Sequence, residues 1–305
     1  MASVDMSVNL GGLAMKNPVT VASGTFAAGR EYSQFVDVHN LGAVTTKGVS
    51  LNGWTGNDSP RIAETPSGML NSIGLQNPGV QHLIEGDIAW LATQDVPVIV
   101  NVSGHSDDEY IQVIEALEAC PTVSAYEINI SCPNVDAGGM TLGTHAPSVE
   151  RVITRCRNAT KRPMIVKLTP NVTDVTEIAK AAEASGADAL SLINTLLGMA
   201  VDAQTRRPQL ARVVGGLSGP AVKPVALRMV WQCYQAVKVP LLGMGGIVSG
   251  IDAAEFMLAG ATAVAVGTAN FMNPHATEDV IDGLQRYCEQ QGVTDVKDLI
   301  GGLVC

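Results

Sequence analysis

A cysteine between two asparagines lies at the end of an apolar run near the middle of the chain. Residues 125–131 are typical of a buried strand, and Asn129, Cys132 and Asn134 lie at its carboxyl end. Parallel α/β folds place their active sites at that end of the strands. A free cysteine is more often a small buried apolar residue. The neighbouring amides, however, offer donors and acceptors that suit a planar, amide-bearing ligand, so we interpret Cys132 as a candidate catalytic thiol.

Two lysines also follow short apolar runs. Lys47 and Lys167 each lie at the end of a predicted buried strand. An ammonium is rarely buried alone, because desolvation costs several kcal/mol unless an anion or strong acceptors compensate. Each lysine therefore either contacts an anionic or electron-rich ligand or pairs with a carboxylate such as Glu127.

Glycines mark the ends of later segments, in Ser218-Gly219-Pro220, Gly245-Gly246 and Gly267-Thr268. In barrels, the loops after the seventh and eighth strands commonly bind phosphate through backbone N–H groups, which glycine lets approach closely. Glycines also end strands for purely conformational reasons. The glycines do not form the Gly-x-Gly-x-x-Gly fingerprint of a dinucleotide site, so a mononucleotide such as FMN fits better than NAD.

Further amides occur in two segments that follow other predicted strands. Residues 71–79 contain three carboxamides between turn-forming residues, and Asn194-Thr195 follows another apolar run. Residues 71–79 can also be explained as an ordinary structured loop. If these amides share a pocket with Asn129 and Asn134, they suit a flat ligand with alternating N–H and C=O groups, such as a pyrimidine.

The overall composition describes a folded protein with a large aliphatic interior. Of the 305 residues, 46% are hydrophobic and 16% are charged, and the formal net charge is −10. This charge disfavours a nucleic acid partner. We expect no membrane segment and a cytoplasmic location. The six cysteines include no Cys-x-x-Cys pair, so we expect no metal site and no iron–sulfur cluster in this chain.

The elements that must position these residues follow a regular rhythm. Eight apolar runs are strand candidates, and most precede a segment of helical periodicity. The runs are 18–23, 43–48, 97–103, 125–131, 164–169, 187–194, 240–246 and 261–267. This order predicts an α/β protein whose residues 1–305 form a single (β/α)8 TIM barrel. Residues 8–19 predict an N-terminal hairpin, turning at Gly11-Gly12, that covers one end. Long connections at 49–80, 133–147 and 195–220 should lie over the C-terminal face.

At these positions the sequence resembles class 1 dihydroorotate dehydrogenases, FMN enzymes of pyrimidine biosynthesis, over essentially its whole length. Residues 129–134, Asn-Ile-Ser-Cys-Pro-Asn, match the catalytic-cysteine motif of the family, and residues 71–79 match its substrate loop. Residues 23–26, 29–32 and 46–48 are more similar to the 1B branch than to the 1A branch.

The resemblance implies that Cys132 removes a proton from C5 of dihydroorotate while hydride passes from C6 to the flavin, and that Lys47 contacts both. Polar side chains and backbone groups would bind the pyrimidine: Lys47, Asn71, Ser72, Ile73, Gly74, Leu75, Asn129, Asn134, Asn194 and Thr195. A second set would bind FMN: Ser23, Lys47, Gly48, Asn101, Asn129, Lys167, Ile193, Gly219, Gly245, Gly246, Gly267 and Thr268. The last five would surround the phosphate.

The 1B resemblance also implies a partner. A second subunit with FAD and a [2Fe–2S] cluster would pass electrons to NAD, and this chain would form a homodimer within a heterotetramer. The flavin domain of dihydropyrimidine dehydrogenases is an alternative, although histidine usually replaces Asn134 there. A non-catalytic flavin-binding scaffold is a second alternative, which the intact Cys132 and Lys47 disfavour.

Overall fold

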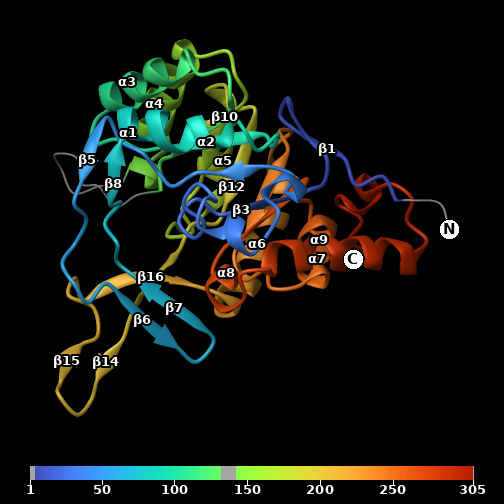
Figure 1. Ribbon diagram of the computed structural model, residues 1–305. Helices are drawn as coiled ribbons and strands as arrows, with labels where there is room; N and C mark the ends of the chain where they lie inside the picture. Colours follow the sequence, from blue (N-terminus) through green and yellow to red (C-terminus); the bar gives the residue numbers. More distant parts are fainter. Residues whose placement is uncertain (1–3, 132–141, 305) are drawn as a thin grey trace.

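An eight-stranded parallel sheet forms the centre of the computed structural model, which describes residues 4–131 and 142–304 (Figure 1). In chain order, its strands are β3 (Val19–Val21), β4 (Val44–Thr45), β9 (Val98–Val102), β10 (Val123–Asn129), β11 (Met164–Lys167), β12 (Ala189–Leu192), β17 (Leu241–Met244) and β18 (Ala263–Val266). The hydrogen-bonded order is β3-β18-β17-β12-β11-β10-β9-β4. Seven strands lie within the predicted runs, and β10 begins two residues before its run at 125–131, so the barrel prediction is confirmed.

Several hydrogen bonds join the outer strands of this sheet. The Gly42 N–H donates to Val19 O (2.9 Å), and the Thr20 hydroxyl donates to Ala43 O (2.8 Å). A Cβ on Gly42 would lie 2.1 Å from the carbonyl oxygen of Asn17, so only glycine allows the two segments to approach this closely. The contacts bring β3 next to β4 and nearly close the sheet into a barrel.

Helices follow most of the strands and pack one apolar face on the barrel. The longer ones are α3 (Asp107–Glu118), α4 (Ala146–Ala159), α5 (Val175–Ala184), α6 (Lys223–Ala236), α7 (Gly250–Leu258) and α9 (Ala276–Gln291). The predicted stripe of α4 is representative, since Val149, Val152 and Ile153 are fully buried. A further helical segment consists of α1 (Val80–Leu83), a short π-helix (Ile84–Ile88) and α2 (Ala89–Leu91). In the described ranges, no helix combines the length and the apolar character needed to cross a membrane.

The predicted N-terminal hairpin consists of β1 (Val8–Leu10) and β2 (Leu13–Met15), which pair in antiparallel fashion. Gly11 has a φ of +60° at the turn, and a Cβ there would lie 2.3 Å from the carbonyl oxygen of Asp188. Asp188 directly precedes β12, so the hairpin covers the amino-terminal end of the strands. The opposite end is left for ligand binding.

Two of the long connections form additional strands beyond the carboxyl ends of the barrel. The first contains β5 (Asn52–Trp54), β6 (Ile62–Thr65), β7 (Gly68–Asn71) and β8 (Asn77–Gly79). The third contains β13 (Leu196–Met199), β14 (Val201–Asp202), β15 (Arg207–Pro208) and β16 (Val214–Ser218). Strands from both join in one sheet of order β13-β16-β7-β6, and β14 and β15 extend away from the barrel (Figure 1). Most of the second connection lies outside the described residues.

Candidate active site

A cavity of about 1020 Å³ lies at the carboxyl ends of the barrel strands, bounded by the two strand-forming loops. Every predicted site residue in the described part of the chain lines it: Ser23, Lys47, Gly48, Asn71, Ser72, Ile73, Gly74, Leu75, Asn101, Asn129, Lys167, Ile193, Asn194, Thr195, Gly219, Gly245, Gly246, Gly267 and Thr268. Cys132 and Asn134 lie outside the described residues. Residues more than 240 positions apart in the sequence thus line the same cavity.

A buried ion pair forms part of the cavity floor. Lys167, at the end of β11, places its Nζ 3.5 Å from Oε2 of Glu127 on β10. The Asn101 amide donates to the same oxygen (2.5 Å), and the Ser191 hydroxyl donates to Oε1 (2.7 Å). The carboxylate alternative predicted for Lys167 is therefore present. Because Lys167 also lines the cavity, the same ammonium can interact with a ligand.

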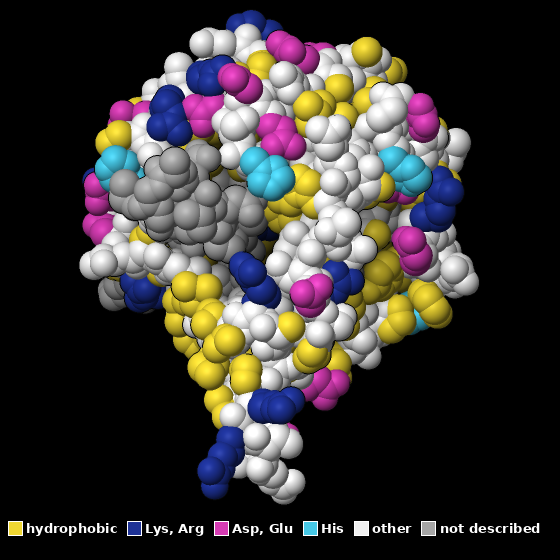
Figure 2. All heavy atoms as spheres, turned by 90° about the vertical axis from the view of Figure 1, so that its left-hand side faces the viewer, with side chains coloured by type: hydrophobic (Ala, Val, Ile, Leu, Met, Phe, Trp, Pro, Cys, Tyr) yellow, Lys and Arg dark blue, Asp and Glu magenta, His cyan; other side chains and the backbone are white. Residues whose placement is uncertain are grey.

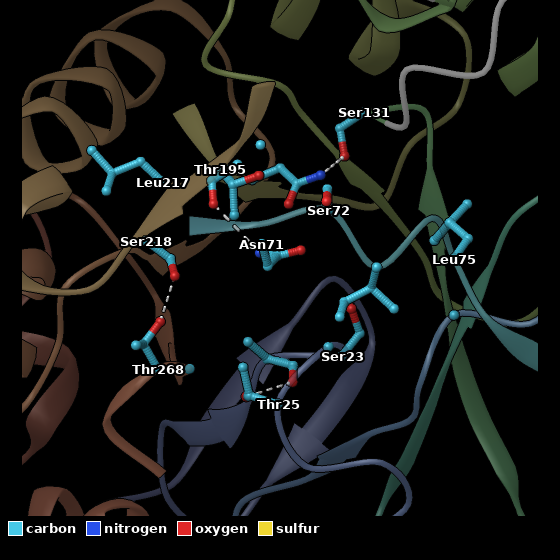
Figure 3. Close-up of a pocket in the computed structure, with 18 of the residues that line it drawn as sticks. Ser23, Thr25, Asn71, Ser72, Leu75, Ser131, Thr195, Leu217, Ser218 and Thr268 are labelled. Carbon is cyan, nitrogen blue, oxygen red and sulfur yellow. Dashed lines mark hydrogen bonds between the residues drawn. The ribbon is translucent and has the colours of Figure 1, made fainter. Parts of the chain in front are cut away.

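The amides of Asn129 and Asn194 meet at Ser131. The Ser131 hydroxyl donates to Asn129 Oδ1 (2.6 Å), and Nδ2 of Asn194 donates to the Ser131 oxygen (2.7 Å; Figure 3). The Tyr110 hydroxyl fixes the Asn129 backbone by donating to its carbonyl (2.8 Å). Thus side chains that follow β10 and β12 are held together before any ligand is considered.

The predicted substrate loop is held by two asparagines at its sides. Asn57 donates from its side chain to Ser72 O (2.9 Å) and from its backbone to Ile73 O (3.0 Å). Asn77 donates from its side chain to Leu75 O (2.8 Å). The Ser72 hydroxyl oxygen is buried without a hydrogen-bond partner in the described part of the chain. An unpaired buried hydroxyl is costly, so it is a candidate contact for a polar ligand.

Glycines shape the opposite side of the cavity. Gly245 and Gly246 have φ values of +122° and +82°, and a Cβ on Gly246 would lie 2.7 Å from Cβ of Lys223. Next to them, the Thr268 hydroxyl donates to the Ser218 hydroxyl (2.8 Å; Figure 3). Since the chain leaves little room for a Cβ at these positions, bare backbone borders the cavity there, an arrangement that suits an anion bound by N–H groups.

An ion-pair cluster supports these glycines from behind. Lys223, at the start of α6, contacts the carboxylates of Asp252 and Glu255 on α7. Burial alone would raise the pKa of Asp252, but hydrogen bonds from Lys223, the Val248 N–H and the Ser249 hydroxyl outweigh it and hold this pKa below its usual value. The cluster ties the loop after β17 to both helices.

Several cavity residues were not predicted from the sequence. They include Ser131, Asn171 and Ser218, together with Trp54 and His105, whose rings lie 3.8 Å apart between centroids. Asn171 accepts a hydrogen bond from the Leu197 N–H (2.9 Å) and so attaches the third long loop to the barrel. Ser131 and Ser218 lie inside or beside predicted motifs, and this position was the only feature of the sequence that could have identified them as site residues. A pairing between Trp54 and His105 has no counterpart in residue spacing.

Comparison with known proteins gives a consistent result. Residues 5–288 match the family described as dihydroorotate dehydrogenase. Proteins named dihydroorotate dehydrogenase B (NAD(+)), catalytic subunit, are 57% identical in Alkaliphilus oremlandii, over 99% of this chain and 100% of that one. The protein of the same name from Geotalea uraniireducens is 53% identical to this chain, over 100% of both chains. A dihydroorotate dehydrogenase from Eimeria tenella, solved with ferulenol, shares the fold, with a TM-score of 0.82 at 23% identity over 98% of this chain and 88% of that chain.

The family match covers the barrel and both loops that bound the cavity, and the bacterial relatives align along the full chain. The chain belongs to the dihydroorotate dehydrogenase family.

Proposed function

We propose that this chain oxidises dihydroorotate to orotate in pyrimidine biosynthesis, with FMN as the bound hydride acceptor. The observation that carries the proposal is the single cavity that combines a buried lysine, a group of amides and a glycine-lined anion site. An amide-rich wall suits the alternating donors and acceptors of a pyrimidine ring. The cytoplasm is the proposed setting.

The cavity residues fit FMN at both of its ends. Gly219, Gly245 and Gly246 have positive φ values and little room for a Cβ, so their bare backbone borders the cavity beside Gly267 and Thr268, which suits the phosphate. At the other end, the flat ring would lie over the floor formed by Asn101 and Lys167, and Ser23, Gly48 and Ile193 would line its sides. A Cβ on Gly48 would lie 2.6 Å from Asn101 Oδ1, so the backbone approaches the floor closely there.

The proposed chemistry divides between the cofactor and the protein. FMN, when bound, accepts the hydride that leaves C6 of the substrate. Cys132 is the proposed base that takes the proton from C5, and it directly follows Ser131 of the cavity wall. Lys47 and the amides of Asn71, Asn129, Asn134 and Asn194, with Thr195 and the backbone of residues 72–75, would hold the pyrimidine in line with the ring. Lys167 would supply positive charge beneath it.

The relatives are named as NAD(+)-linked catalytic subunits. We therefore propose that a separate subunit carrying FAD and a [2Fe–2S] cluster receives the electrons and passes them to NAD. In keeping with this, the sequence has neither a dinucleotide fingerprint nor a cysteine-rich cluster motif.

The proposed homodimer would use the arm formed by β13–β16. Large apolar side chains are at least 44% exposed on this arm and the adjoining β6: Ile62, Leu197, Met199, Val201 and Val214. Figure 2 shows apolar side chains along the protrusion and basic side chains at its tip. A basic tip is attracted to a second copy of a chain whose net charge is −10. Sedimentation should show a dimer that Met199→Glu with Val201→Glu dissociates, whereas Val304→Glu, an exposed apolar control, should not.

Flavin bleaching tests the proposed activity directly. Under anaerobic conditions dihydroorotate should bleach the flavin of the purified chain, and dihydrouracil should not. Bleaching by dihydrouracil would favour the dihydropyrimidine dehydrogenase alternative, and no response to either would favour a scaffold. The isolated chain should reduce an artificial acceptor but reduce NAD poorly, and rapid NAD reduction without a partner would contradict the two-subunit proposal.

A further inference from the structure

A continuous series of hydrogen bonds runs along the cavity wall from Glu127 to Asn194. The Asn101 Nδ2 donates to Glu127 Oε2 (2.5 Å), and the Asn129 Nδ2 donates to Asn101 Oδ1 (3.5 Å). The series continues with the Ser131 hydroxyl donating to Asn129 Oδ1 (2.6 Å) and the Asn194 Nδ2 donating to the Ser131 oxygen (2.7 Å). Every donor in the series is therefore oriented toward the carboxylate.

The direction of this series is fixed at both ends. A carboxylate only accepts hydrogen bonds, so Asn101 must offer its NH₂ to Glu127. Near the other end, the backbone N–H of Ser131 donates to Asn129 Oδ1 (3.2 Å), and a backbone N–H only donates. A reversed Asn129 would place its NH₂ against that N–H. The two ends thus allow the same single orientation of the amides between them.

This direction determines what Asn194 can offer to a ligand. The only proton of the Ser131 hydroxyl is used in the bond to Asn129, so Ser131 can only accept from Asn194. Asn194 must therefore turn its NH₂ toward Ser131. Its Oδ1 has no hydrogen-bond partner among residues 4–131 and 142–304, and Asn194 lines the cavity. A ligand at Asn194 therefore meets an acceptor.

We infer that Ser131 is a positioning residue that holds Asn194 with its carbonyl oxygen available to a ligand N–H. The inference rests on the proposed dihydroorotate site and adds a specificity determinant to it. Without the Ser131 hydroxyl, the two orientations of the Asn194 amide become similar in energy, and the site no longer distinguishes a ligand donor from a ligand acceptor there.

The test compares Ser131→Thr with Ser131→Val, which have nearly the same shape and differ in the hydroxyl. Orotate binding is titrated through the change in flavin absorbance, with FMN content measured on the same samples. The valine variant should retain FMN and bind orotate about tenfold more weakly than the parent, and the threonine variant should bind within about threefold. In steady-state assays the KM for dihydroorotate should rise more in the valine variant than kcat falls, because the amide acts on binding.

Ser191→Ala provides a matched control. Ser191 is also buried and donates to the same series, through Glu127 Oε1 (2.7 Å), but in the described residues it forms no hydrogen bond with Asn194. Its loss should leave orotate affinity within about twofold of the parent. Equal affinity in the threonine and valine variants would overturn the inference, as would an equal loss in Ser191→Ala. A parent chain that binds FMN but gives no response to orotate would instead refute the proposed function.

Discussion

The Lys167 ammonium lies 3.5 Å from the Glu127 carboxylate, and their side chains are only 6% and 1% exposed. Removing one partner from such a pair leaves a buried charge without compensation, whereas removing both charges avoids that cost. The pair lies beneath the proposed flavin ring. We therefore expect stability and flavin binding to be linked at the same two residues.

Lys167→Met should lower the free energy of unfolding by roughly 3–5 kcal/mol. It should also weaken FMN retention, because the proposed positive charge near the ring is lost. The double variant Lys167→Met with Glu127→Gln should be more stable than the single variant, since no buried charge is left unpaired. Urea unfolding of flavin-free samples measures this difference, and a double variant no more stable than the single one would contradict the argument.

Lys47→Ala should affect turnover more than cofactor retention. Lys47 lines the cavity where substrate and ring would meet, so its loss should raise the KM for dihydroorotate and lower kcat. Flavin content should remain closer to that of the parent than it does in Lys167→Met. Flavin absorbance and steady-state kinetics on the same preparations separate the two effects. An unchanged kcat/KM would remove Lys47 from the proposed site.

Cys132→Ser should retain FMN but lose most of its activity at neutral pH. A thiol has a reference pKa of about 8.5, whereas an alcohol is far less acidic. A serine side chain therefore loses its proton much less readily and is rarely in the deprotonated form that acts as a base. Some activity should return as the pH rises. Stopped-flow flavin reduction between about pH 6 and 9 gives the measurement. Rates equal to those of the parent across this range would mean that the proton leaves by another route.

Asp252→Asn should destabilise the protein at pH 7 and less so in acid. The folded-state pKa of Asp252 is lowered, so its stabilising contribution is present above the unfolded pKa and is lost as the pH falls through the folded pKa. We expect a loss of roughly 1–3 kcal/mol at neutral pH. Thermal unfolding from pH 7 down to pH 3 should show the parent and variant converging. Asp282→Asn, at an exposed position of α9, is the control, and a constant difference for Asp252→Asn across this range would contradict the linkage.

The thiols of Cys156 and Cys233 should resist alkylation in the folded protein. Burial raises the pKa of each to about 12, so little thiolate exists near neutral pH. Iodoacetamide labelling followed by peptide mapping should modify both only after urea is added. Rapid labelling of either thiol in the folded state would show that its helix opens locally.

The barrel was predictable because its strands are continuous apolar runs, as expected for strands buried on both faces. Val98–Val102, for example, is fully buried, and its pattern alone identified it. Strands such as Val201–Asp202 and Arg207–Pro208 have neither the length nor the apolar character to be found this way, although they pair with each other in the arm.

The candidate site was predictable to the extent that its residues lie at strand ends. The barrel geometry brings Lys47 and Lys167 to the same face, whatever their separation in the sequence. The pairings between side chains were harder to predict from the sequence. Glu127 was named as one possible partner for Lys167, but its simultaneous bonds to Asn101 and Ser191 depend on strand register, which a single sequence does not specify.

Strand β3 pairs in parallel with β18, which lies near the other end of the chain. A ribosome makes β3 early and reaches Val264 on the order of tens of seconds later. During that interval the growing chain has no β18 to cover the edges of β3 and β17, and such edges promote aggregation. Translation must therefore be nearly complete before this barrel can close, so a premature stop before β18 should yield insoluble protein rather than a smaller working enzyme.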